Sequence, residues 1–159
     1  HCAFLGLDKY NGPVAEAHGP LTIVGWQKIH PTGGQPRFCS YGTDCWYREE
    51  EFADPPLELR WNIALKEIVP KSPSNGWEGM QGMIPDGYKV SSPVVEVTKN
   101  LLYRKKNGVY LNNKHYGATN KLDSLGDRVV VGRCSDGYLN VNRWYGGASD
   151  NVGLSLVRK

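Results

Sequence analysis

Most of the chain alternates hydrophobic and polar residues with a period of two, which is the spacing of a β-strand. The clearest case lies between residues 57 and 65, where one face carries Leu57, Leu59, Trp61, Ile63 and Leu65. The pairs Pro55-Pro56 and Val69-Pro70 flank this stretch, and proline cannot donate a hydrogen bond to a strand ladder. We therefore predict a strand over residues 57–65.

Shorter β-rich stretches recur along the chain between turn residues. We predict further strands at 21–26, 38–48, 88–90, 94–98, 101–103, 109–111, 129–131, 138–144 and 152–157. The Asn107-Gly108 pair predicts a hairpin between 101–103 and 109–111, and 138–144 with 152–157 predicts a closing hairpin. Only residues 47–53 and 120–127 could hold a turn of helix. The pattern favours an all-β fold, an antiparallel β-sandwich or barrel-like domain with long loops.

Composition agrees with a folded β-rich chain. The 159 residues suit a single domain spanning 1–159, and 40% are hydrophobic while 22% are charged. The 19 glycines and 10 prolines imply many turns. Five tryptophans and nine tyrosines stand against three phenylalanines, and polar-tipped aromatic rings suit exposed binding surfaces. The same rings could equally fill the core and rim of a β-fold.

Charge and hydropathy narrow the class of partner. The net charge of +3 comes from basic residues spread along the chain, and the densest run, 104–106, resembles a solvated turn. A nucleic-acid-binding face would need a denser basic footprint. The sequence has no apolar run of the roughly 20 residues that span a bilayer. A start at His1-Cys2 without methionine fits a mature secreted protein, although a trimmed chain would look the same.

The four cysteines favour an oxidising compartment. Cys2, Cys39, Cys45 and Cys134 form no C-x-x-C pair, and the histidine spacing matches no zinc motif. An even count in a loop-rich chain predicts two disulfides and a secreted or cell-surface protein. Three pairings are possible, of which we favour Cys39–Cys45 and Cys2–Cys134. The alternative is four free thiols in a cytosolic protein.

Catalytic constellations are hard to assemble from the sequence. There is no G-x-S-x-G nucleophile motif and no phosphate-binding glycine loop. The acids Glu49, Glu50, Glu51 and Asp54 could supply the paired carboxylates of a carbohydrate hydrolase, but consecutive acids are more often solvated. We predict no catalytic residues, no metal and no cofactor.

The N-terminal histidine is a separate candidate for an enzyme. The amine and ring of His1 could bind copper together with a second histidine, as in secreted copper monooxygenases. That second ligand would have to be His18, His30 or His115. The flanking motifs of those enzymes are absent, so an accidental start residue is the simpler interpretation.

Sugar binding fits the sequence better than catalysis. Carbohydrate sites stack an aromatic face on the pyranose ring and surround it with amide and charged side chains. The segments 140–147 and 112–116 and the glycine-rich loop 76–82 contain such groups. The predicted ligand-binding residues are Asn142, Arg143, Trp144, Tyr145, Trp77, His115 and Tyr116. The alternative is a strand end with ordinary turn asparagines.

Residues 23–71 resemble the receptor-binding domains of chaperone–usher fimbrial tip adhesins of the Mrp and Pap types. The matching features are Val24-Gly25-Trp26, Thr32-Gly33-Gly34, the cysteine-bounded loop 39–45, the following Trp-Tyr-Arg-Glu at 46–49, and the strand from Trp61 towards Lys71. This resemblance implies a β-sandwich-like lectin or adhesin at a pilus tip, followed by a separate pilin domain. The Mrp type also has a His-x-His zinc site, which has no counterpart here. Residues 150–158 resemble the last strand of C-type-lectin-like folds.

These observations together predict an extracellular binding module. Its expected function is that of a fimbrial tip adhesin domain that recognises a host cell-surface glycan or glycoprotein receptor. Pilin subunits would bind through a further domain, and neither nucleic acid nor membrane insertion is expected. A secreted enzyme, either a copper monooxygenase or a carbohydrate hydrolase, is the alternative.

Overall fold

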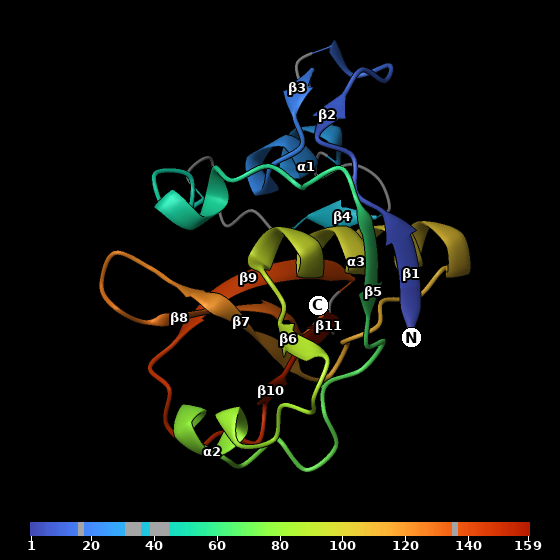
Figure 1. The fold of residues 1–159 in the computed structure, drawn as a ribbon. Helices are drawn as coiled ribbons and strands as arrows, with labels where there is room; N and C mark the ends of the chain where they lie inside the picture. The colour runs from blue at the N-terminus through green and yellow to red at the C-terminus, as the bar shows by residue number, and fades with distance from the viewer. Residues whose placement is uncertain (16–17, 31–35, 39–44, 135–136) are drawn as a thin grey trace.

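A computed structural model describes residues 1–15, 18–30, 36–38, 45–134 and 137–159, and Figure 1 shows its architecture. Strands predominate and helices are few, as the sequence predicts. The described strands form two open sheets and one two-stranded ribbon, so the barrel-like alternative is wrong. No helix in these ranges is both long and apolar enough to cross a membrane.

The smaller sheet is antiparallel and joins the two ends of the chain. Its strands are β1 (Cys2–Leu5), β5 (Trp61–Ala64), β6 (Tyr88–Val90) and β11 (Leu156–Arg158), in the order β1-β5-β11-β6. A single strand, β5, therefore lies between β1 at the N-terminus and β11 at the C-terminus. In β5 the side chains alternate, with the odd positions outward and the even positions buried.

The larger sheet lies at the centre of the molecule and mixes parallel with antiparallel pairs. It consists of β4 (Arg37–Phe38), β7 (Tyr116–Leu122), β8 (Arg128–Gly132), β9 (Tyr138–Trp144) and β10 (Val152–Leu154), in the order β10-β7-β8-β9-β4. The pairs β10–β7 and β4–β9 are parallel, and the pairs β7–β8 and β8–β9 are antiparallel. Residues at both edges thus come from segments far apart in the sequence.

The remaining elements are short except for one helix. They are β2 (Lys9–Tyr10), β3 (Gly19–Pro20), α1 (Ile23–Ile29), the 3-10 turn η2 (Glu51–Ala53), α2 (Trp77–Gln81) and α3 (Pro93–Asn107). The 3-10 turn lies within the region 47–53 in which a helical turn was predicted. The other such region, 120–127, forms the end of β7 and a turn.

Helix α3 lies between the sheets, and every residue from Pro93 to Leu101 is buried. One side contacts β7, β8 and β9, while the Lys99 ammonium donates to the Leu65 carbonyl beside β5, 3.0 Å away. A helix buried on all sides shows no polar stripe, so its valine-rich start reads like a strand. The strand predicted at 94–98 is therefore wrong.

The predicted hairpin around Asn107-Gly108 is also wrong. Gly108 has a φ of 77° and caps the C-terminus of α3, donating its N–H to the Arg104 carbonyl at 2.8 Å. Left-handed glycine is favoured at helix ends as well as in tight hairpins, so the sequence signal fits both. The basic run Arg104-Lys105-Lys106 lies in the last helical turn, where positive charge complements the helix dipole.

Two other predicted strands differ in the structure. Residues 21–26 are largely helical, because Thr22 caps α1 by accepting a hydrogen bond from the Gly25 N–H at 3.0 Å. The strand predicted over 57–65 forms only at Trp61–Ala64. Its apolar face is turned outward, with Trp61 69% exposed, while Asn62 and Ala64 are buried.

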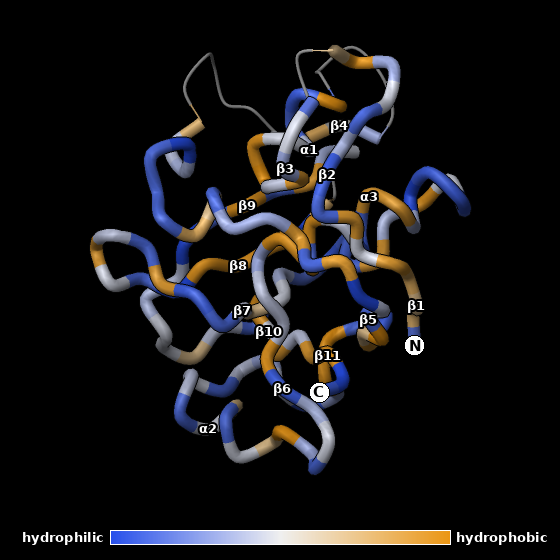
Figure 2. Tube along the Cα trace, turned by 45° about the horizontal axis from the view of Figure 1, so that its top comes forward, coloured by the Kyte–Doolittle hydropathy of each residue, from blue (hydrophilic) through white to orange (hydrophobic). Residues whose placement is uncertain are grey.

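The C-terminal half matches the predicted strands more closely. Strands form at 88–90, 129–131 and 138–144, as predicted. The predicted closing hairpin is wrong, because β10 pairs with β7, and β11 pairs with β5 and β6. The two faces of β8 contact separate hydrophobic clusters, with Val129 and Val131 in one and Val130 in the other. Figure 2 shows the hydrophobic run of β8 as an orange stretch of the chain.

The cysteine pairing differs from the prediction. Cys2, Cys45 and Cys134 carry free thiols, so the predicted Cys2–Cys134 disulfide is not formed. The Cys45 sulfur accepts a hydrogen bond from the Gln27 amide at 2.7 Å, and Cys39 lies outside the described residues. Burial raises the pKa of the Cys134 thiol to about 12, which keeps it protonated at neutral pH.

Candidate functional site

An open pocket of about 540 Å³ lies where α2 approaches the ends of β7, β8 and β9, a region visible at the lower left of Figure 1. We call it the Trp77 pocket. Its walls combine four glycines with the side chains of Trp77, Glu78, Leu122, Arg128, Trp144 and Tyr145. Three of the residues predicted to bind a ligand therefore line one cavity.

Strand register builds one wall of the Trp77 pocket. Leu122 on β7 is opposite Arg128 on β8, and Arg128 is opposite Trp144 on β9. Residues directly opposite each other in an antiparallel pair share a face of the sheet. These three side chains thus form a row across three strands, just beyond Val130, where the apolar face of the sheet ends.

Backbone hydrogen bonds hold the opposite wall in place. The Trp77 N–H donates to the Gly146 carbonyl at 2.8 Å, and the Ser74 N–H donates to the Ser149 carbonyl at 2.9 Å. The Ser74 hydroxyl also donates to the Asp150 carboxylate. Gly146 has a φ of 86°, a conformation that favours glycine, and this turn directs its carbonyl towards α2.

Tyr145 provides the most accessible aromatic ring of the pocket, with 80% of the residue exposed. A Cβ atom on Gly147 would lie only 2.4 Å from the Tyr145 Cε2 atom, so the ring packs directly over the Gly147 backbone. Trp144, in contrast, is 5% exposed, and its indole N–H has no hydrogen-bond acceptor among the described residues. Tyr145 can therefore be changed with little effect on packing, whereas Trp144 belongs to the core.

Arg128 is the cation of the Trp77 pocket. Its guanidinium carbon lies 3.5 Å from the centroid of the Trp77 ring, and its Nη1 donates to the Thr119 carbonyl at 2.9 Å. Burial lowers the pKa of Arg128, because the charged form loses hydration. Stacking fixes the plane of the guanidinium, so its remaining N–H groups have a defined direction.

The other predicted ligand-binding residues lie outside this pocket. The Asn142 amide donates to the Tyr116 hydroxyl at 3.4 Å, a pair on the same face of β9 as Trp144. Arg143 points to the other face, where it bonds the Asp123 carboxylate at 3.2 Å and stacks on Trp46. His115 is not among the lining residues. The closeness of these residues along the sequence thus suggested a single binding site, but the sheet places them outside the Trp77 pocket.

Sequence reasoning missed Arg128 and Leu122, which lie outside the segments that it singled out for sugar binding. Arg128 directly precedes the hydrophobic run 129–131, which marks only the end of a buried strand. Its place beside Trp144 follows from the antiparallel register of β8 and β9. The available signal was therefore the pairing of two predicted strands, not a local motif.

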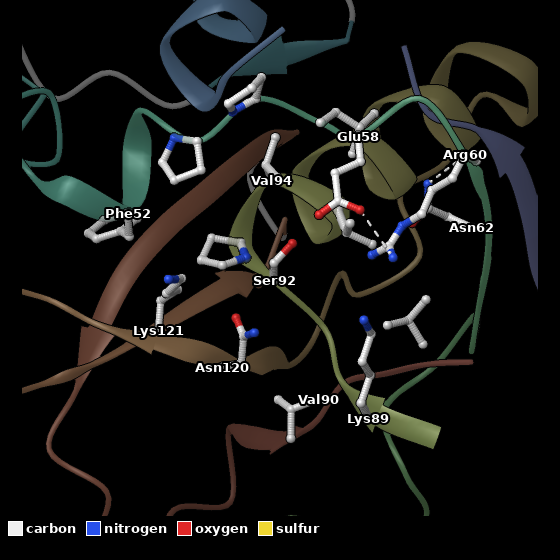
Figure 3. Close-up of a pocket in the computed structure, with 16 residues that line it drawn as sticks. Phe52, Glu58, Arg60, Asn62, Lys89, Val90, Ser92, Val94, Asn120 and Lys121 are labelled. Atoms are coloured by element: carbon white, nitrogen blue, oxygen red, sulfur yellow. Dashed lines mark hydrogen bonds and ion pairs between the residues drawn. The ribbon is translucent and has the colours of Figure 1, made fainter. Parts of the chain in front are cut away.

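A second cavity, of about 260 Å³, lies between the segment 52–62, the start of α3 and strands β6 and β7. Figure 3 shows the ion pair of Arg60 with Glu58 on one side of it and Lys89, Asn120 and Lys121 across from them. The Arg60–Glu58 distance is 3.1 Å, and both side chains are exposed. None of the predicted ligand-binding residues lines this cavity.

A third cavity, of about 510 Å³, lies beside α1 and is lined mainly by apolar groups. His30 at its wall stacks on Trp26, with ring centroids 5.6 Å apart. Burial, and secondarily the charge of Lys105, lowers the pKa of His30 to about 4. The imidazole is therefore neutral at physiological pH.

The residues of the predicted enzyme alternatives occupy other environments. Glu50 is buried, and its carboxylate accepts hydrogen bonds from the backbone N–H and the hydroxyl of Ser124, each at 2.8 Å. Glu49, Glu51 and Asp54 are exposed. The His1 ring is within 2.6 Å of the Tyr88 hydroxyl. In the described part of the chain, no group of three or more His, Cys, Asp or Glu residues could hold a metal ion.

Comparison of the chain with models of protein families, with curated proteins and with solved structures gave no match.

Proposed function

We propose that this protein is an extracellular binding module whose Trp77 pocket receives a carbohydrate ring of a cell-surface glycan. The observation that supports the proposal is the convergence of Trp77, Trp144 and Tyr145 on one open pocket of about 540 Å³. That volume is in the range of roughly 300–1,000 Å³ typical of small-ligand sites.

The chemistry of the lining suits a sugar. The exposed ring of Tyr145 offers a flat apolar surface for the C–H face of a pyranose. Charged and polar groups beside it, including Glu78 and Arg128, match the hydroxyl groups around the edge of such a ring. Because Arg128 covers one face of Trp77, stacking at Tyr145 is the main aromatic contact in this proposal.

The resemblance to fimbrial tip adhesins suggests a biological setting. In that setting the module would be secreted or displayed at a pilus tip and would bind a host glycan or glycoprotein. Pilin subunits would then bind a further domain. This part of the proposal depends on the motifs in residues 23–71, and the pocket itself does not depend on it.

A glycan array with purified protein tests the proposal. Tyr145→Ala is the informative variant, because removal of an exposed ring should leave the fold intact. Trp61→Ala is the matched control, since it removes a similarly exposed ring on β5, outside the pocket. We expect specific glycans to bind, with at least a tenfold weaker affinity for Tyr145→Ala and no change for Trp61→Ala. An array without any specific binding, or equal effects of the two variants, would contradict the proposal.

A further inference from the structure

Arg128 differs from two other arginines of the structure in its charge environment. Arg60 and Arg143 each pair with a carboxylate, at 3.1 and 3.2 Å respectively. Arg128 forms no ion pair with any described residue, although Glu78 lines the same pocket. The Trp77 pocket therefore contains a cation that has no counter-ion among the described residues.

The hydrogen-bonding capacity of Arg128 is also largely unused. A guanidinium carries five N–H donors, and Arg128 makes one hydrogen bond within the described residues, from Nη1 to the Thr119 carbonyl. The Trp77 ring, 3.5 Å away, covers one face of the guanidinium and cannot accept hydrogen bonds from the N–H groups at the edge of the guanidinium. The edge donors thus remain for another partner.

Partial burial makes this unpaired charge costly. Loss of hydration lowers the pKa of Arg128, which means that the surroundings disfavour the charged form. A ligand oxyanion would restore the missing electrostatic compensation, and a stacked arginine binds a carboxylate or sulfate through two parallel hydrogen bonds. The pocket therefore offers an anion a positive charge whose hydrogen-bond donors are mostly unused within the described residues.

We propose that the ligand of the Trp77 pocket is an acidic glycan, in which a carboxylate or sulfate group pairs with Arg128 while the sugar ring stacks on Tyr145. This inference rests on the proposed carbohydrate-binding function and narrows it to a substrate class. A neutral glycan offers Arg128 only hydroxyl groups. Its affinity is therefore lower than that of an acidic glycan of the same size.

Matched oligosaccharide pairs test the inference by titration calorimetry. One pair has terminal glucuronic acid against glucose, and the other has terminal galactose 6-sulfate against galactose. We expect the wild type to prefer the acidic member of at least one pair by tenfold or more, and raised salt to reduce this preference. The two pairs distinguish a carboxylate from a sulfate as the source of the charge.

Variants assign the preference to Arg128. Arg128→Gln should remove the preference for the acidic member. The neutral member loses only hydrogen bonds from Arg128 to its hydroxyl groups, so its affinity should fall much less than that of the acidic member. Arg128→Lys keeps the charge but loses the planar fork, so it should retain only part of the preference. Arg60→Gln, on a different surface, is the control and should behave as the wild type. Thermal unfolding verifies that each variant is folded.

The outcomes separate two kinds of failure. If both members of each pair bind the wild type equally and Tyr145→Ala weakens both, the carbohydrate function stands and the acidic-glycan inference is wrong. If Arg128→Gln keeps the acidic preference, the inference is wrong as well, because another group must recognise the anion. If neither member of either pair binds and the array is also blank, both proposals fail together.

Discussion

Lys99→Met should destabilise the protein by about 3–5 kcal/mol at pH 7, because it leaves a buried carboxylate without a cation. The Lys99 ammonium lies 2.7 Å from the Glu96 carboxylate within α3, and both side chains are 0% exposed. At this distance and an effective dielectric constant of about 20, the attraction is roughly 6 kcal/mol. Desolvation of the two ions costs several kcal/mol each, so the pair as a whole contributes little net stability.

The large effect should therefore arise only when one partner is removed. The Glu96 oxygen that faces Lys99 also accepts from the Ser155 hydroxyl at 3.1 Å, while its other oxygen has no hydrogen-bond partner among the described residues. One neutral hydrogen bond cannot compensate a buried negative charge. In the double variant Glu96→Gln/Lys99→Met no charge remains, and its stability should lie within about 2 kcal/mol of the wild type.

Urea unfolding followed by tryptophan fluorescence measures these free energies. For a chain of 159 residues, 3–5 kcal/mol corresponds to a fall in melting temperature of roughly 6–20 °C. The double-mutant cycle should give a coupling energy of about 3 kcal/mol or more. If Lys99→Met costs less than about 1 kcal/mol, and the effects of the single variants Glu96→Gln and Lys99→Met simply add in the double variant, the pair is hydrated and the reasoning from burial is refuted.

Three further predictions concern other buried or half-buried groups. The pKa of His30 is lowered to about 4 in the folded state from 6.5 in the unfolded state, so its contribution to stability is complete above pH 6.5 and is lost as the pH falls towards 4. Between pH 7 and pH 4, the free energy of unfolding of the wild type should therefore fall by up to about 2 kcal/mol more than that of His30→Phe, as measured by urea titration. Cys2 should react with iodoacetamide in the native protein while Cys134 stays unmodified until unfolding, and equal rates by mass spectrometry would contradict the burial of Cys134. The buried Asp123 carboxylate accepts from two backbone N–H groups at 3.0 and 2.8 Å, so Asp123→Ala should cost about 2–3 kcal/mol, and a loss below about 0.5 kcal/mol would refute this role.

The success of strand prediction depended on whether burial matched the local pattern. Val129–Val131 could be recognised, because a strand covered on both faces is a continuous hydrophobic run. The valines of α3 form the same kind of run, yet they lie in a helix that is covered on all sides. Local composition cannot distinguish these cases, since only tertiary packing decides which backbone geometry places the side chains in the core.

The stretch 57–65 illustrates a different limit. Its alternation indicates two faces, and β5 does alternate, but the polar Asn62 lies inside while Trp61 and Ile63 lie outside. The burial of Asn62 is tolerated because its amide donates to the Arg60 carbonyl at 3.2 Å. Hydrophobicity along the sequence therefore does not determine which face of this strand lies inside.

The Trp77 pocket depends on register more than on any local motif. Val129, Val130 and Val131 are apolar on both faces of β8, so a slip of one residue would keep the core hydrophobic and turn every side chain to the opposite face. Arg128 would then point towards α3, and a valine would take its place beside Trp77. Burial of an unpaired guanidinium against that helix would cost several kcal/mol. The same arginine that we propose as the anion-binding group thus also selects the strand register that places it in the pocket.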